Sequence, residues 1–131
     1  ELQAAMGLAI LPYMDHILEE RKKVVAFYNG QLDFSRLQNL TIRPFTEWNY
    51  SYYSVIFHSE DSLLKTVAAL IEKNICPRRY FYPSLNTIEY TGGKHMPISE
   101  SIAKRILCLP LYASLHDDDL SLICQIINSN V

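Results

Sequence analysis

Apolar residues at the start of the chain recur at spacings of three and four, the period of one face of an α-helix. This pattern runs from Leu2 to Leu32. Because proline lacks a backbone N–H and clashes with the preceding turn, we expect a kink or break at Pro12. Gly30 is expected to end the segment, as glycine commonly does at a helix C-terminus. The pattern therefore predicts two helices, or one bent helix, over residues 1–32.

Four later segments have the character of strands. Residues 50–58 are dense in aromatic and β-branched side chains, and both alternating faces are apolar, which favours an inner strand covered on both sides. Residues 75–82 are expected to form another strand, closed by a proline, and residues 107–111 a third. A shorter extended run over residues 41–43 also ends at a proline.

Helices are expected between these strands. One covers residues 59–74, with Ser59 as its N-cap and two acidic residues in the first turn. An irregular stretch is expected over residues 84–97. After it we expect a short helix whose N-terminal cap lies at residues 99–101. A final helix starts near His116 and buries one apolar face, made of Leu120, Ile123, Cys124 and Ile127. This order predicts an α+β fold in which a small antiparallel or mixed sheet is backed by helices.

Length and composition limit the class of protein. The chain has 131 residues, of which 49 % are hydrophobic, and a formal net charge of −2. We expect a single domain over residues 1–131 with enough apolar surface for a core, which excludes a wholly disordered chain. The near-neutral charge argues against a nucleic-acid partner bound through its phosphates. No apolar run is long enough to cross a bilayer, so no membrane partner is expected.

The cysteines and the first residues add two expectations. Cys76, Cys108 and Cys124 cannot all pair, and they have no C-x-x-C spacing. They lie in apolar runs, so we expect buried free thiols in a protein of the reducing cytoplasm. The chain begins at Glu1, inside a helical pattern and without a cap. We therefore expect it to be a piece of a longer protein.

Most residues that often carry chemistry lack the spacing that chemistry requires. The four histidines form no zinc motif, and no serine or cysteine lies in a nucleophile motif. Residues 117–119 are three aspartates that point in different directions on a helix, so a first-turn charge cluster is expected rather than a divalent-ion site. The sequence assigns no catalytic residue and no metal ligand.

One segment, Arg78–Pro83, stands apart. It places two arginines before three consecutive aromatic residues and a proline. Arginine binds phosphate or carboxylate through two parallel hydrogen bonds, and tyrosine offers a flat face and a hydroxyl group. This composition suits a binding site, but a core strand with surface arginines would have the same pattern. Both interpretations remain open at this point.

Several segments in order resemble one enzyme family. Glu1–Leu11 is similar to the "sELqAAiGlaqL" helix of the DegT/DnrJ/EryC1/StrS sugar aminotransferases. Ile75–Pro83 is similar to their "gI…R.Y..P" segment, and Leu107–Leu111 to "lsLPl". These matches span nearly the whole chain.

The resemblance implies an enzyme of the aspartate-aminotransferase type (fold type I) that depends on pyridoxal phosphate. Such an enzyme transfers an amino group, usually from glutamate, to a keto sugar linked to a nucleotide, and forms homodimers whose active sites use both subunits. The matching part is the C-terminal small domain, which closes over the active site. The large domain, which carries the Schiff-base lysine and most cofactor contacts, would be absent. We therefore expect this chain alone to be inactive and to hold no cofactor.

The resemblance also names substrate-side residues: Arg79, Tyr80, Phe81, Tyr82 and Asn86. The first four fall on the segment that lines the substrate entrance in the family, and we expect Arg79 and Tyr80 to contact the sugar nucleotide. Where many relatives have Pro-Leu-His, this chain has Pro-Ser-Leu-Asn over residues 83–86, which leaves Asn86 or Tyr82 to face the sugar. The segment is most similar to relatives that act on dTDP-linked deoxy sugars. The alternative is a stand-alone binding or interaction module that kept the fold without catalysis.

Overall fold

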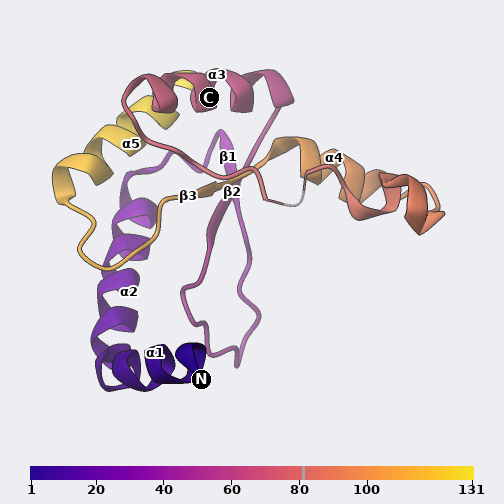
Figure 1. Cartoon of the computed structure of the whole chain (residues 1–131). Helices are drawn as coiled ribbons and strands as arrows, with labels where there is room; N and C mark the ends of the chain where they lie inside the picture. Colours follow the sequence, from indigo (N-terminus) through magenta and orange to yellow (C-terminus); the bar gives the residue numbers. More distant parts are fainter. Residues whose placement is uncertain (81) are drawn as a thin grey trace.

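The computed structural model describes residues 1–80 and 82–131, which form helices around a small sheet (Figure 1). The helices are α1 (Leu2–Ile10), α2 (Met14–Gln31), α3 (Glu60–Glu72), α4 (Pro97–Arg105) and α5 (Asp117–Asn130), with short 3₁₀ turns at Leu11–Tyr13, Leu85–Thr87 and Glu89–Thr91. The strands are β1 (Leu37–Asn39), β2 (Tyr53–Phe57) and β3 (Ile106–Leu109). The predicted α+β class is confirmed.

The sheet is antiparallel, with β2 between β1 and β3. Leu37 pairs with Phe57 on one side of β2, and Tyr53 pairs with Leu109 on the other. All five residues of β2 are buried. The inner strand predicted within residues 50–58 is therefore confirmed, although it is shorter than expected.

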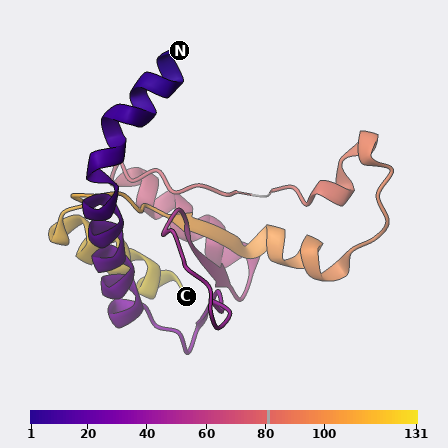
Figure 2. The same ribbon diagram turned by 90° about the horizontal axis from the view of Figure 1, so that it is seen from below.

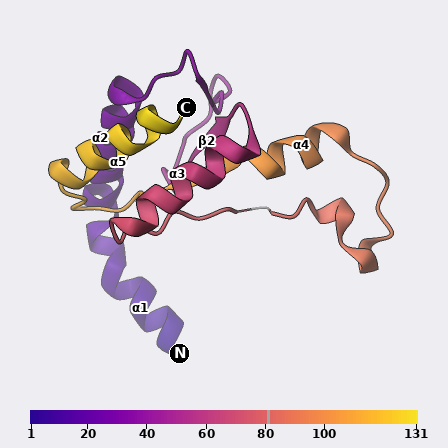
Figure 3. The ribbon, with the colours of Figure 1, turned by 90° about the horizontal axis from the view of Figure 1, so that it is seen from above.

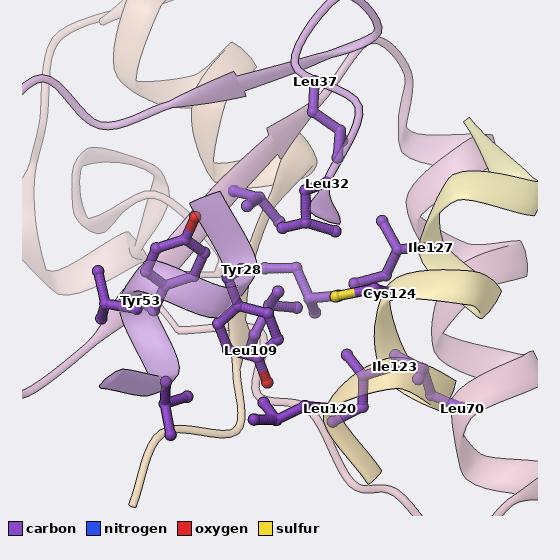
Figure 4. Packing of buried hydrophobic residues seen from close by; sticks show 14 of the residues in the cluster. Tyr28, Leu32, Leu37, Tyr53, Leu70, Leu109, Leu120, Ile123, Cys124 and Ile127 are labelled. Carbon is purple, nitrogen blue, oxygen red and sulfur yellow. The ribbon is translucent and has the colours of Figure 1, made fainter. Parts of the chain in front are cut away.

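One face of the sheet packs against α2, α3 and α5 and forms the core (Figure 4). Alternate strand residues, such as Val55 and Leu107, point into this core, while their neighbours Ser54 and Cys108 lie on the opposite face, because side chains alternate along a strand. The core side of α5 consists of the four predicted residues, Leu120, Ile123, Cys124 and Ile127. Because the helices and the core cover one face of the sheet, a binding site on the sheet can form only on the opposite face.

Two buried tyrosines connect α2 to the sheet. The rings of Tyr28 and Tyr53 stack with centroids 5.0 Å apart, and the Tyr28 hydroxyl donates to the carbonyl oxygen of Pro110 at 2.9 Å. Burial raises the pKa of both phenols. These contacts fix the chain that leaves β3 against α2.

The first helical segment breaks where proline predicts it. Pro12 lies in the 3₁₀ turn between α1 and α2. The predicted end at Gly30 is wrong, because α2 continues to Gln31. Leu32 follows as the C-cap, and its extended backbone lets its side chain enter the core. Burial of Leu32, rather than the flexibility of glycine, sets this boundary.

Helix α3 has caps at both ends. The Ser59 hydroxyl oxygen accepts the backbone N–H of Ser62 at 3.1 Å, as predicted. At the other end Asn74 takes a left-handed conformation with φ of 60°. The N–H groups of Asn74 and Ile75 then donate to Ile71 and Leu70, the two hydrogen bonds of a Schellman motif. The helix predicted over residues 59–74 is confirmed.

Three local predictions are wrong. The extended run at residues 41–43 is not a strand; β1 forms earlier, where Leu37 is buried. The strand predicted over residues 75–82 is not formed by the described residues 75–80, of which Arg78 alone bridges to Cys108 of β3, through two backbone hydrogen bonds. Helix α4 begins at Pro97 rather than at the predicted cap of residues 99–101, because proline suits a first helical position.

The segment from Tyr82 through α4 forms an arm that projects from the body of the molecule (Figures 2 and 3). Its outer part is irregular, as predicted for residues 84–97, with two 3₁₀ turns. Gly93 comes so close to Asn86 that a Cβ atom on Gly93 would lie 2.4 Å from the backbone oxygen of Asn86. Among the described residues, no helix is both long enough and apolar enough to span a bilayer.

Candidate substrate-binding site

A cleft with a volume of about 340 Å³ lies beside the bridge between residue 78 and β3. This volume is within the usual range for ligand pockets, roughly 300–1,000 Å³. Residues from three separate parts of the chain line it: Ser51, Tyr52, Cys76, Arg78, Tyr80, Cys108, Leu109, Pro110, Leu111 and Tyr112. The fold therefore gathers here side chains that are far apart in sequence.

The bridge explains which side chains reach the cleft. Arg78 pairs directly with Cys108, so both side chains lie on the sheet face that points away from the helices. In an extended segment, residues two apart share a face, and Cys76, Arg78 and Tyr80 all line the cleft. Arg79 lies between them and takes the opposite side.

The Arg78 guanidinium lies beside an aromatic ring, that of Tyr80. Arg78 Nη1 donates to the Tyr80 hydroxyl at 2.6 Å, and its Cζ lies 5.7 Å from the centre of the Tyr80 ring. The Tyr80 ring in turn meets Tyr52 edge to face, with centroids 5.1 Å apart. One cation and two aromatic rings thus form a continuous surface along the cleft.

Arg79 is engaged on the helix side. Its Nη2 donates to Glu60 Oε1 at 2.7 Å and to the backbone oxygen of Lys104 at 3.0 Å. Its Cζ lies 3.8 Å from the centre of the Tyr82 ring. These contacts attach the segment to the start of α3 and the end of α4.

Asn86 lies in the arm and holds the arm's shape. Its side-chain nitrogen donates to the backbone oxygen of Lys94 at 2.9 Å and to Glu100 Oε1 at 2.7 Å. The same carboxylate accepts the backbone N–H of Met96, and these hydrogen bonds lower the pKa of Glu100. The Asn86 side chain lines a separate apolar groove beside α4, not the cleft.

The residues named from sequence are thus distributed over three places. Tyr80 lies in the cleft, whereas Arg79 and Tyr82 lie together beside α3, and Asn86 lies in the arm. Phe81 lies outside the described residues.

The sequence indicated the segment that contains Arg78, but it assigned the ligand contact to Arg79, and it did not indicate Tyr52. The signal was present for Arg78, because residues 78 and 80 share one face of an extended segment. Tyr52 could not be found this way, since it comes from a segment that only the folded sheet brings alongside.

The prediction that all three cysteines are buried is wrong for one of them. Cys76 is exposed, while Cys108 and Cys124 are buried free thiols. Cys76 lies two residues before Arg78, which alone among residues 75–80 pairs with β3, so Cys76 itself is outside the sheet. Burial raises the pKa of the Cys108 thiol, and that of Cys124 to about 11.

The described lining of the cleft is suited to ligand binding. Among the lining residues that the structure describes, Arg78 alone carries a full charge. Its positive charge favours an anionic ligand, and the rings favour a ligand with a flat group. Among the described residues, no three His, Cys, Asp or Glu side chains are grouped to hold a metal ion.

The described residues do not form a site that fits pyridoxal phosphate by themselves. A lysine that holds this cofactor must lie in an enclosed site, but all six lysines of the chain are exposed. Three of them form ion pairs on helix surfaces: Lys22, Lys23 and Lys65.

Comparison with known protein families gives a match over nearly the whole chain. The model of the DegT/DnrJ/EryC1/StrS aminotransferase family matches residues 1–128. The dTDP-4-amino-4,6-dideoxy-D-glucose transaminase of Escherichia coli is 30 % identical over 129 residues, which cover 90 % of this chain and 34 % of the relative. GDP-perosamine synthase of Vibrio cholerae is 29 % identical, over 98 % of this chain and 36 % of the relative.

Comparison with solved structures gives the same fold. The PLP form of Spr1654 from Streptococcus pneumoniae, named as a sugar aminotransferase, superposes with a TM-score of 0.84 at 21 % identity. The match covers 97 % of this chain and 34 % of that structure. The chain therefore spans about a third of the length of the relatives it matches.

Proposed function

Since this chain belongs to the DegT/DnrJ/EryC1/StrS aminotransferase family, we propose that it is the C-terminal small domain of a nucleotide-sugar aminotransferase that depends on pyridoxal phosphate. In this proposal the domain closes the active site and helps to bind the keto-sugar nucleotide. The observation that carries the proposal is the family match over residues 1–128, combined with coverage of only about a third of each relative.

The substrate class follows from the relatives' names. One acts on a dTDP-linked amino sugar and another makes a GDP-linked one. We extend to this chain the feature that both share, a sugar linked to a nucleoside diphosphate. The cleft supports this assignment, because it combines one positive charge with aromatic rings.

The segment 79–82 and Asn86 form the proposed substrate-side edge. Tyr80 would contact the ligand, since it lines the cleft. Arg79 and Tyr82 would hold the segment in place through Glu60, and Asn86 would shape the arm. Phe81 remains a predicted member of this edge.

Cofactor, amino donor and assembly complete the proposal. Because all lysines of this chain are exposed, pyridoxal phosphate would be held by residues outside it. Glutamate is the proposed amino donor and a homodimer the proposed assembly. The three free thiols suit the reducing cytoplasm as the compartment.

A stand-alone binding module is the second candidate, because the cleft itself offers binding groups and no catalytic pair. The two candidates differ in what is encoded immediately before Glu1. Determining that coding sequence tests the proposal: we expect a preceding domain that contains the Schiff-base lysine. A start codon directly before Glu1 would overturn the small-domain assignment and favour the module.

A further inference from the structure

We infer that Arg78, rather than its neighbour Arg79, is the arginine that binds the diphosphate of a nucleoside diphosphate ligand in the cleft. This inference rests on the proposed function for the identity of the ligand. It concerns which of two adjacent, chemically identical side chains meets that ligand.

The contacts of the two guanidinium groups distinguish them. Arg79 already pairs with a carboxylate, that of Glu60, at 2.7 Å, and its side chain is only 21 % exposed. Within residues 1–80 and 82–131, no carboxylate pairs with Arg78, whose residue is exposed. An arginine has five N–H donors, and the contact with the Tyr80 hydroxyl uses one of them. Arg78 therefore has donors available for an anion.

The position of Arg78 is fixed by its backbone. The N–H of Arg78 donates to the carbonyl oxygen of Cys108 at 3.1 Å, and the N–H of Cys108 donates back at 2.9 Å. The ion pair between Arg79 and Glu60 holds the next residue. Because both positions are held, the side chain of Arg78 is directed to the cleft without a large loss of backbone entropy on binding.

The surroundings select the chemistry of the ligand. Of the described residues that line the cleft, Arg78 alone is fully charged, so none of them places a carboxylate against a bound phosphate. A planar guanidinium binds phosphate oxygens in pairs. Tyr52, Tyr80 and Tyr112 line the same cleft, which suits a ligand with a flat base near its phosphates. A nucleoside diphosphate has both groups.

Binding of dTDP to the complete protein that contains this chain tests the inference without requiring catalysis. Titration calorimetry would give the dissociation constants of dTDP and of thymidine, which lacks phosphate. For Arg78→Ala we expect dTDP to bind about tenfold to a hundredfold more weakly, because a hydrogen-bonded charge contact is lost, with little change for thymidine. Arg78→Lys keeps the positive charge but lacks the planar guanidinium. Its affinity for dTDP should therefore lie between those of wild type and Arg78→Ala.

Two variants control for charge and for position. Arg36→Ala removes one positive charge from an exposed residue outside the cleft and should leave the affinity for dTDP within about twofold, since distant surface charges are screened. Arg79→Ala should weaken dTDP binding less than Arg78→Ala does. Three results would each overturn the inference. They are an Arg78→Ala protein that binds dTDP as tightly as wild type, a loss of dTDP affinity in Arg79→Ala that equals or exceeds the loss in Arg78→Ala, and a wild-type protein that does not bind dTDP.

Cys76 provides an independent readout, because it lines the same cleft and is exposed. Bound dTDP should slow alkylation of Cys76, followed by mass spectrometry of its peptide, in wild type but not in Arg78→Ala at the same dTDP concentration. Equal protection in both proteins would contradict the role of Arg78. A protein that binds dTDP through Arg78 but transfers no amino group would refute the proposed function and leave this inference intact.

Discussion

At the scale of single residues, one extended segment separates two adjacent arginines into different environments. Arg78 faces an open cleft among aromatic rings, and Arg79 is held between Glu60 and the end of α4. A partly buried ion pair of this kind contributes little net stability. It does fix the geometry of the segment, because a guanidinium with two hydrogen-bond acceptors has few alternative positions.

The three cysteines are predicted to differ in their reaction with a thiol reagent at pH 8. In the 131-residue chain, Cys76 is exposed and should react rapidly, because the reagent has access to it. Cys108 and Cys124 should react only in denaturant, since both are buried and burial raises their pKa, that of Cys124 to about 11. A higher pKa leaves less thiolate at a given pH, so their rates stay low even when the reagent has access. Cys76→Ser should abolish the fast phase; three thiols of equal rate would contradict this description.

At the scale of elements, the arm depends on one close contact. The turn near Gly93 returns the chain alongside Asn86, and hydrogen bonds from Asn86 to Lys94 and Glu100 close it. The arm projects from the body (Figure 2), so it can lose its structure without loss of the core. Its order therefore rests on local geometry.

Two neighbouring glycines give a matched test of that geometry. Gly93→Ala places a Cβ atom 2.4 Å from a backbone oxygen, which forces the turn open. Gly92→Ala is strained, with φ of 54°, but meets no atom within 4 Å. We expect proteolysis of residues 84–97 to accelerate by tenfold or more in Gly93→Ala, since about 1.4 kcal/mol of lost local stability has that effect. Gly92→Ala should accelerate it less. The reverse order, or cleavage throughout the core, would show that the close contact does not hold the arm.

Local signals predicted helices better than strands. Pro12, the Ser59 cap and the buried face of α5 all follow from neighbouring residues, and the structure confirms them. Strand formation in this segment depends on a partner far away in sequence, and among residues 75–80 β3 provides pairing only for Arg78. The same limit applies to the site: composition pointed to the arginine–aromatic segment, but only the bridge to β3 shows which arginine faces the cleft.

At the scale of the whole molecule, α1 has no place in the core. None of its residues is buried, and the apolar side chains from α1 to the following turn are 46–75 % exposed: Leu2, Met6, Leu8, Ile10, Leu11 and Tyr13. Residues 1–11 are almost without polar side chains, so the helix that they form exposes apolar groups on most of its surface. A contiguous apolar surface of this kind favours association.

The 131-residue chain is therefore predicted to self-associate in sedimentation velocity at high concentration. Replacing Leu8 and Leu11 by glutamine should weaken that association by about tenfold or more, because burial of even one leucine side chain contributes about 1.5–3 kcal/mol. Leu64→Gln changes a leucine of α3 that is 48 % exposed and is the matched control. A chain that remains strictly monomeric, or an equal effect of Leu64→Gln, would contradict the role of α1.

The central claim is that this chain is one part of a nucleotide-sugar aminotransferase, and amino transfer by the complete protein tests it most directly. The measurement is glutamate formed from dTDP-4-amino-4,6-dideoxy-D-glucose and 2-oxoglutarate in the presence of pyridoxal phosphate, with the 131-residue chain alone as the comparison. We predict glutamate formation by the complete protein and none by the chain alone, whose lysines are all exposed. Two results would contradict the account. One is that the complete protein transfers no amino group with this sugar or with a GDP-linked amino sugar, and the other is that the chain alone does transfer it.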